Sequence, residues 1–317
     1  MIPHPPLFIG LLAACLLATA STPAPAQQRL RERILQQAQP QSEDAGPGAR
    51  APLPPGVRVE RDIAYGPDPR QRYDVYLPAH ARPDAPVLFM VHGGGWRRGD
   101  KGMHSVVGNK AAYWLRRGFV FVSANYRLEP DADPLAQAGD VAAALASLRR
   151  RARGWNADPT KTILMGHSAG AHLVALLGSN PAGLLREAGA HRPLGVVSLD
   201  SGALDVPALM GQPRLPQLYR DAFGTDPAYW ASVSPQQQLA RGALPMLLVC
   251  ASSRQFPTSP CAEAREFAAR AASLSVPMQV LPEALKHGEI NDQLGQPSAY
   301  TDAVSAWIQR ALMQVRR

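Results

Sequence analysis

Short apolar runs alternate with longer stretches of helical periodicity along most of the chain. Segments 57–64 and 71–77 alternate apolar and polar residues, and the Gly-Pro-Asp-Pro sequence at 66–69 between them predicts a β-hairpin. The later apolar runs are continuous, which is typical of strands that a parallel sheet buries on both faces. The predicted buried strands cover residues 87–91, 119–124, 162–165, 194–199, 246–249 and 278–281. The predicted helices cover residues 105–117, 134–150, 169–177, 262–274 and 298–315.

This alternation predicts an α/β protein with a mostly parallel sheet and helices on both faces. Ligands of such sheets gather at the carboxyl ends of the strands. Residues 201–242 do not follow the alternation, because they are rich in proline, glutamine and aromatic residues. We expect this segment to form a small cap over the site.

The first 26 residues have the pattern of an export signal. Residues 7–18 (LFIGLLAACLLA) are apolar but too few to cross a bilayer as a helix, so they predict no membrane span. Ala-x-Ala cleavage sites end at Ala20 and Ala26, which predicts a periplasmic or secreted protein. A lipoprotein is the competing interpretation, because the Leu-Ala-Ala-Cys sequence ending at Cys15 resembles a bacterial lipobox and would attach a lipid there.

Residues 27–56 are rich in glutamine, proline, alanine and glycine, and predict a disordered linker. One folded domain would then occupy residues 57–317. Its two cysteines, Cys250 and Cys261, flank one predicted loop, so they would form a disulfide in an oxidising compartment. Two reduced, partly buried thiols are the alternative.

The chain has 317 residues and a formal net charge of +8. Most of its basic residues are scattered arginines, and the run at 149–153 ends a predicted helix, where cations suit the helix dipole. The sequence has no nucleic-acid-binding motif and no interleaving of basic and aromatic residues. We therefore expect a solvated basic surface and no nucleic-acid partner.

A candidate nucleophile lies in residues 166–170 (GHSAG), which follow a predicted strand and open a predicted helix. This is the context that the G-x-S-x-G motif requires, because the serine occupies a sharp turn that the flanking glycines relieve of crowding. Ser168 would be the nucleophile. The helix N-terminus offers the Ala169 N–H to a developing oxyanion.

A glycine run, Gly93, Gly94 and Gly95, follows the predicted strand at 87–91. Glycines leave backbone N–H groups free to approach one oxygen without interference from a Cβ atom. Together with the N–H of Ala169, these residues would form the oxyanion hole of a tetrahedral intermediate.

Several motifs together resemble the hormone-sensitive-lipase-like and feruloyl-esterase-like (BD-FAE) branch of the α/β hydrolases. They are residues 92–96 (HGGGW), 166–170 (GHSAG), 73–78 (YDVYLP), 123–128 (SANYRL) and 156–159 (NADP). The resemblance extends from about residue 57 to the C-terminus, closely through Leu177 and loosely in the cap. It implies the α/β-hydrolase fold with an eight-stranded sheet, no metal or organic cofactor, and a small-molecule ester as substrate.

In this family the last catalytic residue along the chain is a histidine after the final strand, and His287 stands there. The family normally places an aspartate after the strand at 246–249, but the loop between the two cysteines has no carboxylate, and Arg254 stands where the aspartate is expected. Asp200, at the end of the preceding strand, is the first choice for the acid. Asp205 and Glu263 are alternatives, as is a Ser-His dyad.

These residues predict a serine hydrolase that cleaves carboxylic esters through an acyl-enzyme on Ser168. The same residues would serve an amidase, an arylformamidase or a peptidase, and the missing aspartate leaves room for a non-catalytic binding protein. Five aromatic residues would either line a substrate pocket or pack the cap: Trp96, Tyr126, Tyr219, Phe223 and Trp230.

Overall fold

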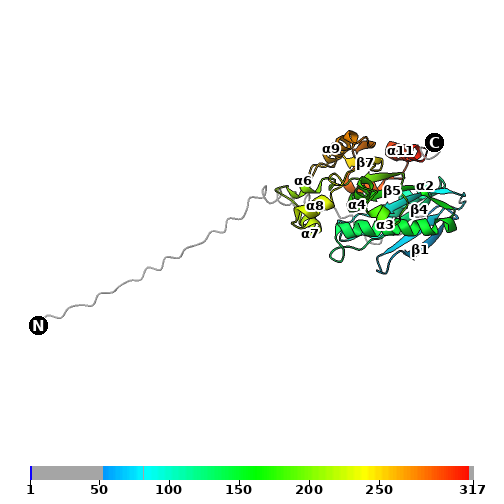
Figure 1. Ribbon diagram of the computed structural model, residues 1–317, viewed down its shortest axis with the longest axis horizontal. Coiled ribbons are helices and arrows are strands. Elements are labelled where there is room, and N and C mark those ends of the chain that lie inside the picture. Colours follow the sequence, from blue (N-terminus) through cyan, green and yellow to red (C-terminus); the bar gives the residue numbers. More distant parts are fainter. Residues whose placement is uncertain (2–52, 81, 314–317) are drawn as a thin grey trace. The chain divides into compact units, whose positions relative to one another are not determined.

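The computed structural model describes Met1 and residues 53–80 and 82–313 (Figure 1). The predicted signal peptide, the alternative lipid anchor at Cys15 and the predicted linker up to residue 52 lie outside the described residues. The boundaries proposed for these segments therefore stay predictions. Within the described part of the chain, no helix is both long enough and apolar enough to cross a membrane.

The described domain is built on an eight-stranded sheet with the order β1-β2-β4-β3-β5-β6-β7-β8. β1 and β2 form the predicted antiparallel hairpin, β2 pairs antiparallel with β4, and all later neighbours are parallel. This is the predicted α/β-hydrolase architecture. The strands are β1 (Arg58–Ala64), β2 (Arg72–Leu77), β3 (Ala85–Val91), β4 (Val120–Ala124), β5 (Ala157–His167), β6 (Gly195–Leu199), β7 (Met246–Ala251) and β8 (Met278–Glu283).

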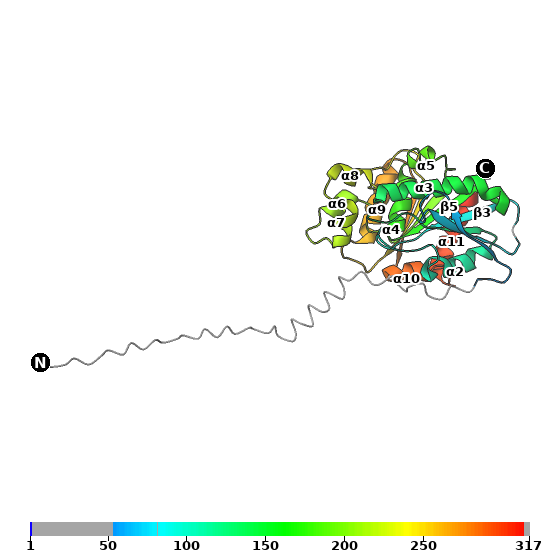
Figure 2. The ribbon, with the colours of Figure 1, turned by 90° about the horizontal axis from the view of Figure 1, so that it is seen from below.

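Helices cover both faces of the sheet, and each face has its own apolar core (Figure 2). On one face, side chains of α3, α4 and α9 share an apolar core with Val87, Phe89 and Val91 of β3. On the other face, side chains of α2, α10 and α11 share a core with Leu88 and Met90 of β3. The alternation of side chains along β3 thus serves both cores, which explains its continuous apolar run. The helices are α2 (His104–Leu115), α3 (Pro134–Arg151), α4 (Ala169–Ser179), α9 (Pro260–Ser273), α10 (His287–Asp292) and α11 (Ala299–Met313).

Three short helices, α6 (Val206–Met210), α7 (Gln217–Phe223) and α8 (Pro227–Ser232), lie between β6 and β7, in the segment for which a cap is predicted. α6 and α8 have a proline in their first turn, and α7 has a proline at its N-cap. Aspartate side chains cap α6 and α8. Proline and aspartate favour helix starts, but helices this short carry little apolar periodicity. The sequence pattern therefore predicted an irregular cap segment here and not these three helices. A further short helix, α5 (Leu184–Glu187), follows α4.

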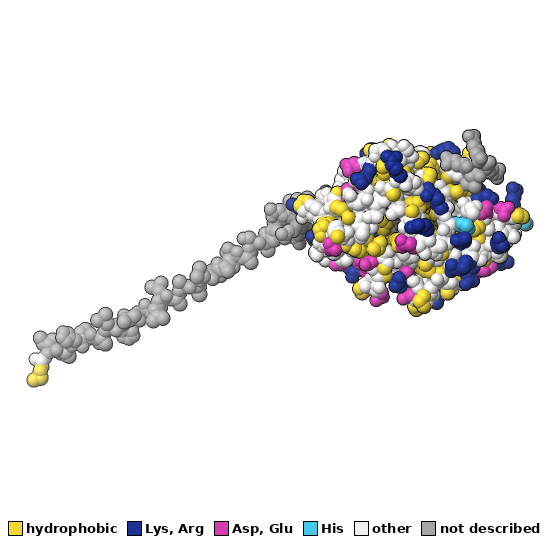
Figure 3. Space-filling model, in the orientation of Figure 1, with side chains coloured by type: hydrophobic (Ala, Val, Ile, Leu, Met, Phe, Trp, Pro, Cys, Tyr) yellow, Lys and Arg dark blue, Asp and Glu magenta, His cyan; other side chains and the backbone are white. Residues whose placement is uncertain are grey.

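The predicted disulfide between Cys250 and Cys261 is present, with Cα atoms 5.2 Å apart, so the alternative of two reduced thiols is wrong. It joins the end of β7 to the first turn of α9 and closes the loop between them. On the face of the molecule that Figure 3 shows, basic side chains are scattered among acidic and apolar ones rather than gathered in one patch.

Candidate active site

Ser168 lies at the tight turn between β5 and α4. Its backbone has φ 55° and ψ −118°, a conformation that L-residues rarely adopt. A Cβ atom on Gly166 would lie 2.3 Å from the Gly170 carbonyl oxygen. A Cβ atom on Gly170 would lie 2.4 Å from the carbonyl oxygen of Val91. Both positions require glycine, because the turn packs this closely on itself and on the end of β3.

His287 is the first residue of α10 and connects Ser168 to Asp200. Its Nε2 lies 3.0 Å from the Ser168 Oγ, and its Nδ1 lies 2.5 Å from the Asp200 Oδ2. With the proton on Nδ1, the ring donates to the carboxylate and accepts the hydrogen bond of the serine hydroxyl. The structure therefore brings together the predicted nucleophile, the predicted base and the first choice for the acid.

Asp200 follows β6 and is fully buried. Its Oδ1 accepts a hydrogen bond of 2.7 Å from the Ala251 N–H, and its Oδ2 lies 3.4 Å from the Arg254 guanidinium. Burial alone would raise the pKa of Asp200, but the hydrogen bond to His287 and the charge of Arg254 outweigh it and lower the pKa below its ordinary value. The carboxylate therefore stays ionised near neutral pH, as support of an imidazolium requires.

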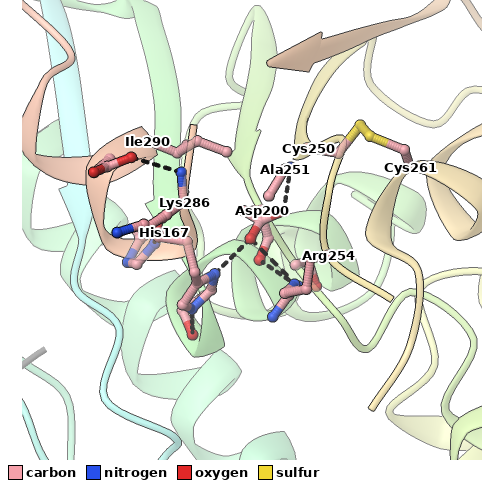
Figure 4. A network of polar contacts seen from close by, with 12 residues as sticks. His167, Asp200, Cys250, Ala251, Arg254, Cys261, Lys286 and Ile290 are labelled. Carbon is pink, nitrogen blue, oxygen red and sulfur yellow. Dashed lines mark hydrogen bonds and ion pairs between the residues drawn. A yellow bond between two sulfur atoms is a disulfide. The ribbon is translucent and has the colours of Figure 1, made fainter. Parts of the chain in front are cut away.

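The loop that the disulfide closes holds this carboxylate at both oxygens (Figure 4). Ala251 directly follows Cys250, and Arg254 lies three residues further along the same loop. Arg254 also donates to the Asp200 carbonyl oxygen, at 3.4 Å. The sequence marked Arg254 only as the residue found where an acid was expected. Its contact with Asp200 could not be predicted from the sequence, because it depends on the ends of β6 and β7 lying side by side.

The two alternative acids are held elsewhere. Asp205 caps α6 through the Ala208 N–H, and its other oxygen accepts a hydrogen bond of 2.8 Å from Gln236. Glu263 lies on α9 and accepts a hydrogen bond of 3.3 Å from the Leu204 N–H. Removal of the Glu263 carboxyl from water raises its pKa to about 7. Neither geometry resembles that of Asp200 against the His287 ring.

The glycine run after β3 lies against Ser168. A Cβ atom on Gly93 would lie 3.0 Å from the Ser168 Cβ. Gly94 and Gly95 have φ values of 110° and 59°, which glycine adopts without the steric cost that other residues incur. Ala169, the first residue of α4, faces the same turn. A pocket adjoins the loop and is lined by Gly93, Gly94, Gly99, Met103, Ser105, Val106, His167 and Asn291.

Three of the five aromatic candidates for pocket residues pack the interior instead. Trp96, Tyr126 and Phe223 are almost fully buried. Trp96 packs edge-on against Phe223, with ring centroids 4.9 Å apart, and Tyr126 stacks on His92 at 4.4 Å. Tyr219 and Trp230 are only half-buried. The interpretation as packing therefore holds for the buried three.

His172 on α4 connects Trp96, which follows the glycine run, to the cap segment, a role that its position on a predicted helix did not reveal. Its Nδ1 accepts a hydrogen bond of 3.2 Å from the Trp96 indole, and its Nε2 donates to the Val233 carbonyl oxygen at 2.7 Å. Both bonds require the neutral ring. Burial lowers the pKa of His172 to about 4, so the ring stays neutral in the folded protein well below pH 6.5.

This neutral histidine predicts a pH-dependent stability. Between pH 6.5 and about 4 the unfolded chain binds a proton at residue 172 that the folded chain does not, so acidification favours unfolding. Relative to His172→Gln, the free energy of unfolding of the wild type should fall by about 1.4 kcal/mol per pH unit in this window. Urea unfolding of both proteins at pH 7.5 and pH 5 measures the difference. The comparison cancels other groups, such as Glu263, whose raised pKa acts in the opposite direction. An identical pH dependence in both proteins would contradict the prediction.

The sheet order defines the α/β-hydrolase fold, and the contacts of Ser168, His287 and Asp200 have the arrangement that serine hydrolases use. Comparison with known proteins agrees. Residues 73–187 match the BD-FAE family model. Esterases are also found among the sequence relatives and structural neighbours, so this part of the chain is similar to esterases of the α/β-hydrolase fold.

Two sequence relatives and one solved structure illustrate the similarity. The probable isoprenylcysteine alpha-carbonyl methylesterase ICME of Oryza sativa subsp. japonica is 31% identical over 118 residues, which are 37% of this chain and 28% of the relative. Kynurenine formamidase of Danio rerio is 31% identical over 116 residues, 37% of each chain. The chain thus spans well under half the length of these curated relatives. Esterase B from Lactobacillus Rhamnosis shares the fold, with a TM-score of 0.69 and 22% identity over 91% of this chain and 96% of the other. That esterase has also been solved with a tributyrin phosphonate inhibitor.

Proposed function

We propose that this protein is a serine hydrolase that cleaves carboxylic esters of small molecules through an acyl-enzyme on Ser168. One observation carries the proposal: a single imidazole, that of His287, lies within hydrogen-bond distance of both the Ser168 hydroxyl and the Asp200 carboxylate. A hydroxyl in this arrangement can lose its proton to the ring as it attacks a carbonyl carbon.

In the first half of the reaction, the Ser168 Oγ attacks the ester carbonyl while His287 Nε2 takes the hydroxyl proton. The carbonyl oxygen becomes an oxyanion, which the backbone N–H groups of the Gly93–Gly95 loop and of Ala169 stabilise. Each such donor contributes about 3 kcal/mol in the transition state. Collapse of the intermediate breaks the bond to the alcohol oxygen, and His287 gives its proton to that leaving group.

In the second half, His287 takes a proton from water, the resulting hydroxide attacks the acyl carbon, and the acid is released as Ser168 regains its proton. Asp200 stays ionised throughout, holds the Nδ1 proton of His287 and stabilises the imidazolium. The buried Ala251 N–H and the Arg254 guanidinium keep its carboxylate in place.

Amide hydrolysis is the second candidate, because one of the relatives is a formamidase. A panel of p-nitrophenyl esters and matched formanilides separates the two. We expect kcat/KM for p-nitrophenyl butyrate to exceed that for formanilide by at least about tenfold, because an amine leaves only after it is protonated by His287, whereas p-nitrophenolate leaves without a proton. Dominant turnover of the formanilide would replace the ester assignment. Absence of any turnover above that of Ser168→Ala would favour a non-catalytic binding protein.

We also propose that the protein is exported, to the periplasm or as a secreted protein, with a lipid anchor at Cys15 as the alternative. A disulfide in the folded domain supports this, because such bonds persist mainly in oxidising compartments. N-terminal sequencing of the mature protein distinguishes a chain that starts after Ala26 from one that starts at Cys15.

A further inference from the structure

Lys110 on α2 is a lysine in an apolar interior. Its side chain is almost completely buried, and Val106, Val107 and Trp114 of the same helix belong to the surrounding core. Lysine is rarely buried this deeply, because the removal of an ammonium group from water is costly. Burial lowers the pKa of Lys110 to about 7, and the charge of Asp292 only partly offsets this effect. A lysine kept at this cost calls for a role that an apolar side chain could not fill.

The amino group of Lys110 bonds to backbone carbonyl oxygens on two different helices. One is the oxygen of Ser105, in the first turn of α2, at 2.7 Å, and the other is the oxygen of Asn291 in α10. The group has at least two N–H donors whether or not it carries its third proton, so both bonds form in either state. Lys110 thus connects α2 to α10, the helix that begins with His287 (Figure 2).

Side chains from neighbouring helices hold the carbonyl groups of residues 290–292 at the end of α10. The last carbonyl groups of a helix have no partner within the helix and must find one outside it. Tyr300 on α11 donates to the first of the three oxygens at 2.9 Å, and Lys110 donates to the second. Asn109, the neighbour of Lys110 on α2, donates through its Nδ2 to the third, the Asp292 oxygen, at 2.7 Å. Two of the three donors therefore come from consecutive residues of α2.

α10 has only six residues, so its direction depends on what it packs against. A helix of fewer than two turns is marginal on its own, because ordering its first turn costs more than one hydrogen bond contributes. At its start, the His287 carbonyl oxygen lies 3.0 Å from the Nε2 of His167, the residue before Ser168. After its end, the chain packs closely on α2: a Cβ atom on Gly295 would lie 2.3 Å from the Asn109 carbonyl oxygen. The contacts with α2 therefore help to set how α10 presents the His287 ring to Ser168.

We propose that Lys110 and Asn109 are positioning residues of the active site, which hold the end of α10 so that the His287 ring stays within hydrogen-bond distance of its partners. The inference rests on the proposed hydrolase function and adds to it two residues that act through a helix and not on the substrate. Asn291 lies one helical turn after His287, so the loss of a bond there should tilt α10 and displace the ring. A displacement of about 1 Å can slow a reaction about 100-fold.

Lys110→Met tests the proposal, because methionine has a similar length and shape but no N–H donor. We expect kcat for p-nitrophenyl butyrate to fall about tenfold while KM stays within about twofold of the wild type, since a displaced ring slows proton transfer more than it weakens substrate binding. Asn109→Leu makes the same kind of change at a half-buried position and should lower kcat about threefold. This second variant decides the question if Lys110→Met does not fold.

Leu115→Ala is the matched control for a loss of stability alone. Leu115 is the last residue of α2 and is buried in the same core as Lys110. Its truncation leaves a cavity, so the urea midpoint should fall, while kcat should stay within about twofold of the wild type. Lys110→Met replaces a buried amino group by an apolar one, so its urea midpoint should fall less than that of Leu115→Ala. Activity and stability should therefore change in opposite order in the two variants.

The Nδ1 proton of His287 gives a second readout that needs no turnover. Its hydrogen bond to Asp200, with 2.5 Å between nitrogen and oxygen, should move its NMR signal far downfield, and the absence of that signal from His287→Gln assigns it. We expect Lys110→Met to shift this signal upfield or to broaden it beyond detection. Leu115→Ala should leave it in place.

The outcomes separate this inference from the proposed function. An unchanged kcat in folded Lys110→Met and Asn109→Leu overturns the positioning role. An equal loss of kcat in Leu115→Ala also overturns it, because activity would then only follow stability. If the wild type cleaves no ester, the hydrolase function fails, and the NMR signal alone decides: a shift in Lys110→Met or Asn109→Leu supports the positioning of His287, and an unchanged signal in both overturns it.

Discussion

Ser168→Ala should lower kcat for p-nitrophenyl butyrate by about 10⁶-fold, the size of effect seen when a serine protease loses its nucleophile. The reason is that the His287 Nε2, 3.0 Å from the Ser168 Oγ, then has no hydroxyl from which to take a proton. The effect should fall on kcat rather than on KM, because the Gly93–Gly95 loop and the pocket beside it remain in the variant. Steady-state kinetics on the purified variant measure both.

A fluorophosphonate probe tests independently whether Ser168 is the nucleophile. It should label the wild type and leave Ser168→Ala unlabelled, since it reacts with an activated serine. Ser253→Ala, which removes an exposed hydroxyl, should be labelled like the wild type. Equal labelling of Ser168→Ala and the wild type would show that another residue is the nucleophile.

Asp200→Asn should lower kcat by about 10⁴-fold while the protein stays folded. An amide cannot accept the Nδ1 proton of His287 with the strength of a carboxylate and can instead donate to the ring, which favours the wrong tautomer. Arg254 and the Ala251 N–H also lose their charged partner. Kinetics with p-nitrophenyl butyrate and a circular dichroism spectrum together separate lost chemistry from lost folding.

Asp205→Asn is the matched control for this change. Asparagine caps a helix about as well as aspartate, so α6 should persist and activity should stay within about twofold of the wild type. If Asp205→Asn loses the activity and Asp200→Asn keeps it, the acid has been assigned to the wrong residue.

The fold could be predicted because its signal is repeated along the chain. Each central strand is a short continuous apolar run, and each helix between the strands is long enough to show its periodicity. The exceptions are elements whose sequence lacks such a pattern. α10 has six residues and is mostly polar, so residues 287–292 gave no helical signal. β5 begins at Ala157, five residues before its predicted start, because Ala157 pairs with Ala85.

The candidate site could be predicted to the extent that local sequence encodes it. Ser168 and the Gly93–Gly95 run are marked by turns whose backbone demands glycine. The acid is different, because no local pattern distinguishes Asp200 from Asp205 or Glu263. What distinguishes it is the sheet: Leu199 and Val249 are neighbours in β6 and β7, so a residue after either strand reaches the same imidazole. The catalytic roles themselves stay predictions until the variants are measured.

The bond between Cys250 and Cys261 ties the acid of the site to the redox state of its surroundings. Neither cysteine belongs to the two apolar core clusters, whereas the segment between the cysteines holds Asp200 through Ala251 and Arg254. We expect a chain that folds without this disulfide to be compact but to have a low kcat. It should reach full turnover only where the two cysteines can be oxidised. With the export proposed above, the proposed esterase activity would stay low in the reducing cytosol and rise after the disulfide has formed outside it.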